Sequence, residues 1–262
     1  MRRSCVYLVY VLVLIGQSAW SDNEGSLPRV PPDKRGSLDC HQVGSAFQPF
    51  DLSQNRFIGK FGFGFRYENQ CENAVYVARK VNSVAVCNWN GRNFQPYGVL
   101  NNNAVGKRDF GFFDSDMCNY SVERSANGLL CNTSGGGWTP YEIESSLPVA
   151  KANGDQHYGF LEIEDCFQEI RLVNENSLCS WNGRNWQPYY IGAKRLIGIQ
   201  DFGFRQIEDC RMSVRLARNG LVCNWNGNGL QLYRVEDNAP VGPTTHSTVF
   251  NCYSEADSYL RK

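Results

Sequence analysis

The feature that most constrains the fold is a cysteine-bounded segment that recurs along the chain. Its clearest copy opens on Cys179, passes through a Trp-Asn-Gly turn and a Gln-Pro-Tyr segment, and closes through Asp-Phe-Gly-Phe on Cys210. The other copies are Cys87 to Cys118, Cys40 to Cys71, Cys131 to Cys166 and Cys223 to Cys252. The opening cysteines are 47, 44, 48 and 44 residues apart. A period of this size indicates tandem units, each of which buries its apolar face only against its neighbours.

The start of the chain has the pattern of a secretory signal peptide over Met1 to Ser21, with two arginines, an apolar run and small residues at the cleavage site. A membrane anchor is the alternative, but the apolar run of about 11 residues is short against the roughly 20 that span a bilayer. Residues 22–39 are rich in Pro, Gly and charge, so we expect a flexible leader before a single domain over residues 40–262. Lys34-Arg35 within it is either a processing site or part of a solvated linker.

The cysteine count and the charge both favour a secreted, extracellular protein. Removal of the signal peptide leaves ten cysteines, an even number that predicts five disulfides in an oxidising compartment. The whole chain has 26 basic and 26 acidic residues, and the loss of Arg2 and Arg3 leaves two more acidic than basic residues. This charge gives no basic field for nucleic acid, so we expect no nucleic-acid partner. No segment after the signal peptide is apolar enough to span a membrane, so we expect no membrane span after cleavage.

The repeated segments predict an all-β fold. Within the fourth unit the sequence favours strands over Trp186 to Ile191, Leu196 to Ile207, Arg211 to Ala217 and Leu221 to Trp225, with a hairpin turn at Asn219-Gly220. Four antiparallel strands in about 45 residues match a propeller blade. We expect five units in a closed ring, with a fifth blade completed by residues 39–43 and 253–260 from the two ends of the chain. The alternative is an open stack of hairpins or a β-sandwich.

The disulfide pairing can be predicted from the hairpin turn. If Asn219-Gly220 is the turn centre, Cys223 faces Leu216 and lies about 20 Å along the strand from Cys210. A disulfide requires Cα atoms within about 7 Å. We therefore expect each copy to close on itself, rather than each closing cysteine to bond the next opening one. The predicted pairs are Cys40–Cys71, Cys87–Cys118, Cys131–Cys166, Cys179–Cys210 and Cys223–Cys252.

No set of residues typical of catalysis is found in the sequence. His41, His157 and His246 stand in unrelated contexts without metal-type spacing, and every mature cysteine has an expected disulfide partner. Acidic residues recur before four of the closing cysteines, where we expect solvated turns rather than calcium ligands. The sequence therefore predicts a non-enzymatic protein with no cofactor and no metal.

The motif Trp-Asn-Gly-Arg-Asn-aromatic-Gln-Pro-Tyr, at 89–97 and 181–189, is the best candidate for ligand binding. Aromatic faces and directed donors suit sugars, and weak sites gain from repetition. The candidate binding residues are Trp89, Arg92, Trp181, Arg184 and Trp225. The alternative is that the aromatic residues form the core and the arginines are solvated.

These features favour a multivalent, lectin-like protein whose partners are glycans or extracellular matrix components. The alternative is a structural component of an extracellular matrix or secreted covering, and a weaker one is a secreted inhibitor or effector that binds a protein. Asn119 and Asn132 are acceptors for N-glycosylation, so we expect the face that carries them to be exposed.

Overall fold

The computed structural model describes residues 37–107, 110–133, 135, 137–149 and 159–259. The predicted signal peptide and residues 22–36 of the predicted leader, including Lys34-Arg35, lie outside these ranges, as does His157. The first strand begins at Leu38, whose side chain is buried, so the folded domain starts two residues before the predicted boundary at Cys40.

The described residues form five consecutive units, each built from an antiparallel hairpin, a loop and one helix. In every unit the opening cysteine lies in the first strand of the hairpin and the closing cysteine lies in the helix. The fold is therefore mainly β in small sheets, with a helix added to each unit. The first unit contains β1 (Leu38–Val43), β2 (Ala46–Asp51), β3 (Arg56–Phe57) and α1 (Glu68–Lys80), and the second contains β4 (Ala85–Trp89), β5 (Phe94–Gly98) and α2 (Ser115–Glu123). The third contains β6 (Leu129–Thr133), β7 (Trp138–Glu142) and α3 (Ile163–Arg171), and the fourth contains β8 (Ser177–Trp181), β9 (Trp186–Tyr190), β10 (Arg195–Leu196) and α4 (Ile207–Leu216). The fifth contains β11 (Leu221–Trp225), β12 (Leu230–Arg234), β13 (Pro240–His246) and α5 (Val249–Tyr259).

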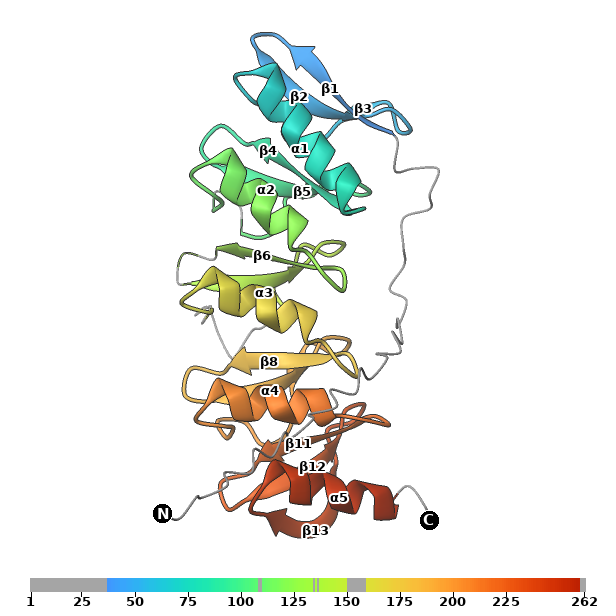
Figure 1. The fold of residues 1–262 in the computed structure, drawn as a ribbon, viewed down its shortest axis with the longest axis vertical. Coiled ribbons are helices and arrows are strands. Elements are labelled where there is room, and N and C mark those ends of the chain that lie inside the picture. Colours follow the sequence, from blue (N-terminus) through green and yellow to red (C-terminus); the bar gives the residue numbers. More distant parts are fainter. Residues whose placement is uncertain (1–36, 108–109, 134, 136, 150–158, 260–262) are drawn as a thin grey trace, which may run out of the picture.

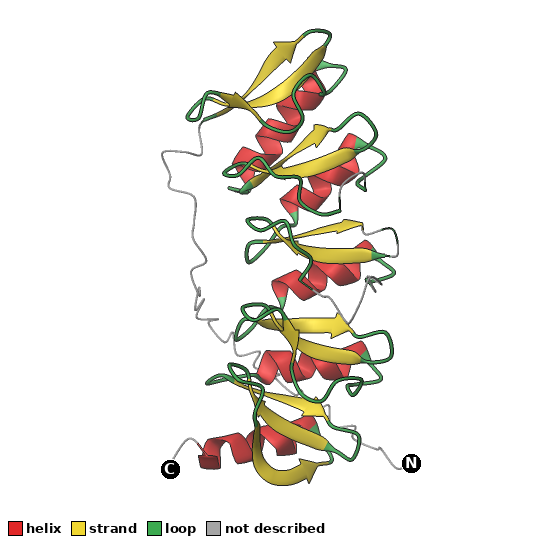
Figure 2. Ribbon diagram, turned by 180° about the vertical axis from the view of Figure 1, so that it is seen from behind, coloured by secondary structure: helices red, strands yellow, loops and turns green. Residues whose placement is uncertain are grey.

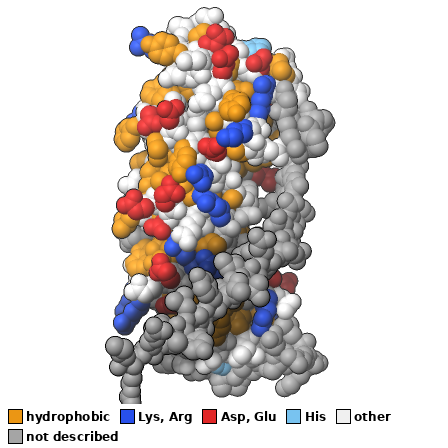
Figure 3. All heavy atoms as spheres, viewed as in Figure 1, with side chains coloured by type: hydrophobic (Ala, Val, Ile, Leu, Met, Phe, Trp, Pro, Cys, Tyr) orange, Lys and Arg blue, Asp and Glu red, His pale blue; other side chains and the backbone are white. Residues whose placement is uncertain are grey.

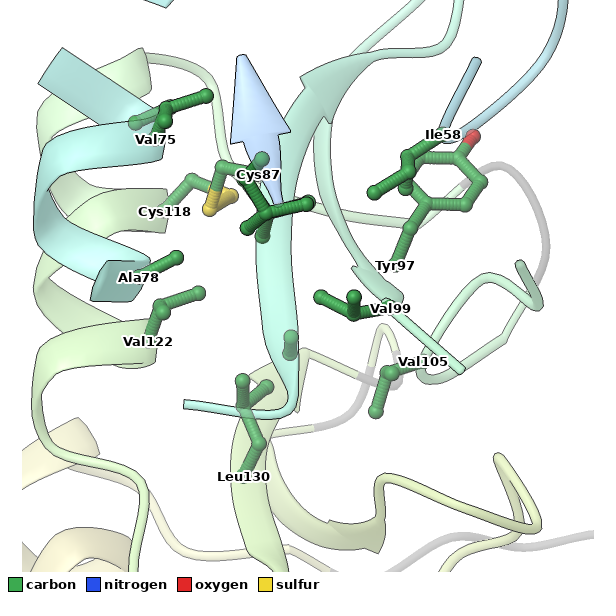
Figure 4. Packing of buried hydrophobic residues seen from close by; sticks show 14 of the residues in the cluster. Ile58, Val75, Ala78, Cys87, Tyr97, Val99, Val105, Cys118, Val122 and Leu130 are labelled. Carbon is green, nitrogen blue, oxygen red and sulfur yellow. A yellow bond between two sulfur atoms is a disulfide. The ribbon is translucent and has the colours of Figure 1, made fainter. Parts of the chain in front are cut away.

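The units lie one above another in an open stack, with the first and fifth units at opposite ends (Figure 1). The helices run along one side of the hairpins over the whole length of the stack (Figures 1 and 2). Around β4, helix residues such as Val75 and Val122 pack on one side of the strand, and Ile58, Tyr97 and Val105 lie on the other side (Figure 4).

The predicted closed ring is not found among the described residues, and the open-stack alternative describes the arrangement. Each sheet contains strands of a single unit. Residues 39–43, expected to complete a fifth blade, belong to β1 and pair with β2, and residues 253–259 belong to α5. Because a loop and a helix replace the predicted second and third strands of the unit, no four-stranded blade is available for closure among the described residues.

The strand predicted over Arg211 to Ala217 is instead most of helix α4. The alternation of Met212, Val214 and Leu216 favoured a strand, but Met212 is 37% exposed. Cys210, Val214 and Ala217 are buried, which is the spacing of one helical face. The predicted long strand over residues 196–207 is also wrong, because the chain bends after β10 and turns at Asp201, whose φ is +67°.

The turn predicted at Asn219-Gly220 is present but joins a helix to a strand. Both residues have positive φ, 55° and 70°, which Asn and Gly adopt most readily. The backbones of Arg218 and Leu221 exchange two hydrogen bonds across the turn. The same turn occurs at Asn127-Gly128, between α2 and β6.

The predicted disulfide pairing is confirmed. The ten cysteines between residues 40 and 252 form five bonds, each within one unit, with Cα atoms 6.0 to 6.3 Å apart. Each bond joins a hairpin to the helix of the same unit, so every unit is cross-linked internally, and none of these five disulfides joins one unit to another.

Aromatic stacking joins one unit to the next. Phe65 of the first unit lies on Phe94 of the second, with ring centroids 5.6 Å apart. Phe112 and Trp138, and then Phe160 and Trp186, form the same contact at the next two junctions. The second phenylalanine of each Asp-Phe-Gly-Phe or related segment is therefore the apolar connection that the stack requires.

Candidate functional site

The Trp-Asn-Gly-Arg-Asn motif forms the tip of a hairpin, and its polar residues hold the tip together. In the second unit, the Oδ1 atom of Asn90 accepts hydrogen bonds from the backbone nitrogens of Arg92 and Asn93 at 2.8 Å. The Nδ2 atom of Asn90 donates to Oε1 of Gln95 at 2.9 Å. Asn182 and Gln187 repeat this bond in the fourth unit at 2.8 Å. These residues are therefore structural.

The glycine of the motif lies beneath an aromatic ring of the preceding unit. A Cβ atom on Gly91 would come within 2.5 Å of Cε1 of Phe63, and one on Gly227 within 2.4 Å of Cε1 of Phe202. In the first and fourth units the first phenylalanine of the segment thus covers the next hairpin tip, and the second, Phe65 or Phe204, is buried. The motif needs glycine for this close approach as well as for its positive φ.

The predicted ligand-binding tryptophans of the second and fourth units pack within their own hairpins. Trp89 lies across from Phe94 with ring centroids 5.0 Å apart, and Trp181 lies across from Trp186 at 5.3 Å. Both tryptophans are half-buried, whereas Arg92 and Arg184 are exposed. Trp89 and Trp181 thus pack within their hairpins, as the alternative interpretation expects, and each keeps part of its surface exposed.

The two predicted glycosylation residues are buried, so the expectation of an exposed face is wrong. Asn132 is fully buried and its Nδ2 donates to the backbone oxygen of Val105 at 2.8 Å. Asn119 is buried in α2, and neither its Oδ1 nor its Nδ2 has a hydrogen-bond partner among the described residues. A glycan has no space at either side chain in the folded chain.

The asparagine that is buried in the first hairpin strand connects neighbouring units. Nδ2 of Asn88 donates to the backbone oxygen of Ile58 at 2.9 Å, and Nδ2 of Asn224 donates to that of Ile197 at 2.8 Å. These two oxygens also accept a hydrogen bond from a glutamine of their own unit, Gln48 or Gln187. The backbone carbonyls of Ile58 and Ile197 thus each accept one hydrogen bond from their own unit and one from the next unit.

A hollow of about 1090 Å³ opens between the fourth and fifth units. It is bounded by the tip of the β8–β9 hairpin, by the loop after β10 with the start of α4, and by the tip of the β11–β12 hairpin. We call it the groove. The lining residues are Arg184, Asn185, Gln200, Asp201, Phe202, Gly203, Phe204, Arg205, Asp209, Trp225 and Gly227.

The groove combines aromatic surface with charged groups of both signs. Phe202 is 40% exposed and Trp225 is half-buried, so each ring offers part of one face. No described residue forms a hydrogen bond or ion pair with the guanidinium of Arg184 or Arg205, or with the carboxylate of Asp201 or Asp209. Such a surface can stack on an apolar face and form directed hydrogen bonds around it.

Two of the five predicted binding residues, Arg184 and Trp225, meet in this groove although they come from different units. Trp89, Arg92 and Trp181 are not among its lining residues. The sequence reasoning missed Phe202 and Arg205. A signal was present, because a phenylalanine stands two residues before the buried one in the first, second and fourth units, at Phe63, Phe110 and Phe202.

Neither a metal site nor a membrane helix is found in the part of the chain that the structure describes. No group of three or more His, Cys, Asp or Glu side chains there is arranged to hold a metal ion. Within the same ranges, no helix has the length and apolar character needed to cross a bilayer.

The fold thus defines a class of protein, an open stack of hairpin–helix units that are each closed by one disulfide. Comparison of the chain with protein-family models, curated proteins and solved structures finds no match.

Proposed function

We propose that the groove between the fourth and fifth units is a carbohydrate-binding site, and that the protein is a secreted, lectin-like and non-enzymatic binding protein. The observation that carries the proposal is the placement of two partly exposed rings, Phe202 and Trp225, in one hollow with two Arg and two Asp side chains that have no partner among the described residues. Sugars offer apolar C–H faces ringed by hydroxyl groups, and this lining complements both features.

The charges of the groove favour an uncharged sugar. Arg184 and Arg205 are balanced by Asp201 and Asp209, so the lining has no net charge to attract a polyanionic glycan. Carboxylates accept hydrogen bonds from hydroxyl groups and guanidinium groups donate them. A neutral glycan can use both kinds of group without leaving a charge unpaired.

Secretion forms part of the same proposal. All ten cysteines of residues 40–252 are in disulfides, which persist in oxidising compartments. The signal-peptide pattern at residues 1–21 supports the same location.

The experiment is a glycan and polysaccharide array, including chitin, probed with the oxidised protein and two matched double variants. Arg184→Ala/Arg205→Ala removes both guanidinium groups from the groove. Arg92→Ala/Arg66→Ala removes arginines at the equivalent positions of the second and first units, outside the groove. We expect the groove variant to lose at least about tenfold in affinity for the bound glycan and the control to change less than about twofold.

Equal losses in the two variants would contradict the groove as the site. A blank array would contradict carbohydrate binding altogether and favour the structural role in an extracellular matrix.

A further inference from the structure

Two apolar side chains protrude from the edge of the stack where the helices of the second and third units begin. Phe113 is 94% exposed and Leu161 is 88% exposed. Each directly follows a buried phenylalanine, Phe112 or Phe160, that stacks on the next unit. The buried ring therefore belongs to the fold, whereas its exposed neighbour contributes no packing to it.

The repeat itself does not require an apolar residue at this position. The equivalent residues are Arg66 in the first unit and Arg205 in the fourth. Burial of a Phe or Leu side chain stabilises a fold, and this gain is not realised at Phe113 or Leu161. Phe113 and Leu161 occupy equivalent positions of consecutive units, and exposed apolar side chains that recur in this way can form a patch that marks an interaction surface.

Acidic side chains surround this patch. Asp116 lies in the first turn of α2, Glu162 precedes α3, and Glu164 lies in its first turn, and all three are exposed. In Figure 3, acidic and hydrophobic side chains lie next to one another along the margin over the starts of α2 and α3. We call Phe113, Leu161, Asp116, Glu162 and Glu164 the acidic-apolar patch.

We propose that the acidic-apolar patch binds a protein segment that carries apolar and basic side chains, such as an amphipathic cationic helix. The charge complementarity decides the kind of partner. Lysine or arginine side chains pair with the three carboxylates while leucine or phenylalanine side chains cover Phe113 and Leu161. An arginine over the ring of Phe113 adds a cation–π contact. The same carboxylates repel an anionic membrane or a polyanionic glycan.

This surface is separate from the groove. None of its residues lines the groove, and it belongs to the second and third units instead of the fourth and fifth. Failure of carbohydrate binding therefore leaves this proposal standing, and the reverse also holds.

The test uses a fluorescent synthetic peptide of roughly 18 residues, built from Lys and Leu at helical spacing, and a second peptide with Glu in place of Lys. Binding to the oxidised protein is followed by fluorescence anisotropy at about 50 and about 300 mM salt. We expect the Lys peptide to bind and the Glu peptide not to bind. The variant Phe113→Ser/Leu161→Ser should weaken binding of the Lys peptide at least tenfold. Asp116→Asn/Glu162→Gln should remove most of its salt dependence.

The matched control is Leu52→Ser/Leu147→Ser, which replaces two exposed leucines, 50% and 49% exposed, outside the patch. The affinity of this control for the Lys peptide should change by less than twofold, and circular dichroism establishes that all three double variants are folded. Wild-type affinity in Phe113→Ser/Leu161→Ser, or equal binding of the Glu peptide, would overturn the proposal. Self-association in sedimentation velocity that disappears in this variant would also overturn it, because the patch would then bind a second copy of the chain.

Discussion

The carboxylate of Glu169 in α3 forms an ion pair with the guanidinium of Arg211 in α4, and both side chains are buried between the third and fourth units. The second carboxylate oxygen of Glu169 accepts a hydrogen bond from the backbone nitrogen of Cys179 at 3.0 Å. Burial alone would lower the pKa of Arg211, but its hydrogen bond with Glu169 and the charge of that carboxylate raise it. The pair thus connects two helices and the next hairpin.

Arg211→Ala should destabilise the protein by about 3–5 kcal/mol, because it leaves the Glu169 carboxylate buried without its main partner. The measurement is chemical denaturation of the oxidised protein. Arg215→Ala, on the exposed side of the same helix, is the control and should cost less than about 0.5 kcal/mol. The double variant Glu169→Met/Arg211→Met should recover most of the loss. A cost for Arg211→Ala no larger than that of the control would contradict the role of the pair.

A second prediction concerns Gly198, which approaches Asn224 of the next unit. A Cβ atom on Gly198 would lie 2.5 Å from Nδ2 of Asn224, and φ at this glycine is +96°. Gly198→Ala should therefore cost at least about 2 kcal/mol. The chain itself suggests a compensation, because Ser180 replaces this asparagine at the junction of the third and fourth units, where Ala150 replaces the glycine. Ala150 lies outside the described residues.

The test of this compensation is a double-mutant cycle by chemical denaturation. We expect Gly198→Ala/Asn224→Ser to be more stable than the sum of the two single changes predicts, by at least about 1 kcal/mol. Additive effects within about 0.3 kcal/mol would show that the two positions are not coupled.

A third prediction is that the folded protein carries no glycan at Asn119 or Asn132. Both side chains are buried, and Asn132 uses its Nδ2 atom to bond Val105 of the preceding unit. Intact-mass spectrometry of protein secreted from a glycosylating host should therefore give the mass of the polypeptide with its disulfides. A folded product fully glycosylated at Asn132 would contradict this packing.

A fourth prediction concerns alkaline pH. Burial raises the pKa of Tyr141 and of Tyr253 to about 12, against 10.0 for an ordinary tyrosine. Each neutral phenol is therefore favoured in the folded state. The stabilisation of the folded state that comes from each raised pKa is complete below pH 10. This stabilisation is lost as the pH rises towards 12.

Urea denaturation between about pH 9 and pH 11 should show this fall in the free energy of unfolding. Tyr253→Phe should be less stable at neutral pH, because the phenol donates to the backbone oxygen of Ser213 at 2.7 Å, and should show a smaller alkaline fall. Native tyrosines that all titrate near pH 10 would contradict the burial.

The sequence predicts the number, spacing and internal disulfides of the units, because cysteines and turn glycines are constrained locally. It does not predict the helices. Helices of 9 to 13 residues contain two to three turns, too few for a clear period, and in α4 the alternation around Met212 and Val214 mimics a strand. The disulfide prediction was correct although its hairpin argument was not, because Cys210 lies in a helix that packs on its own hairpin.

The candidate site could be predicted only in part for a similar reason. The aromatic and arginine residues of the repeated motif are evident in the sequence, but their roles depend on the neighbouring unit. Trp181 is half-buried beside Trp186, whereas Trp225 faces Leu230 in its hairpin and contributes to the groove. The sequence shows that the hairpin partners differ, but it does not show which tryptophan borders a groove, because that depends on packing between units.

The most direct test of the proposed site is an NMR titration. The protein is labelled with ¹⁵N at its tryptophan indole nitrogens, and the glycan selected on the array is added to it. The N–H signals are followed by NMR and assigned by single Trp→Phe replacements. The indole signal of Trp225 should shift on binding, while those of Trp89 and Trp181 should not. A shift at Trp89 or Trp181 with Trp225 unchanged would place the ligand at the hairpin tips and contradict the groove.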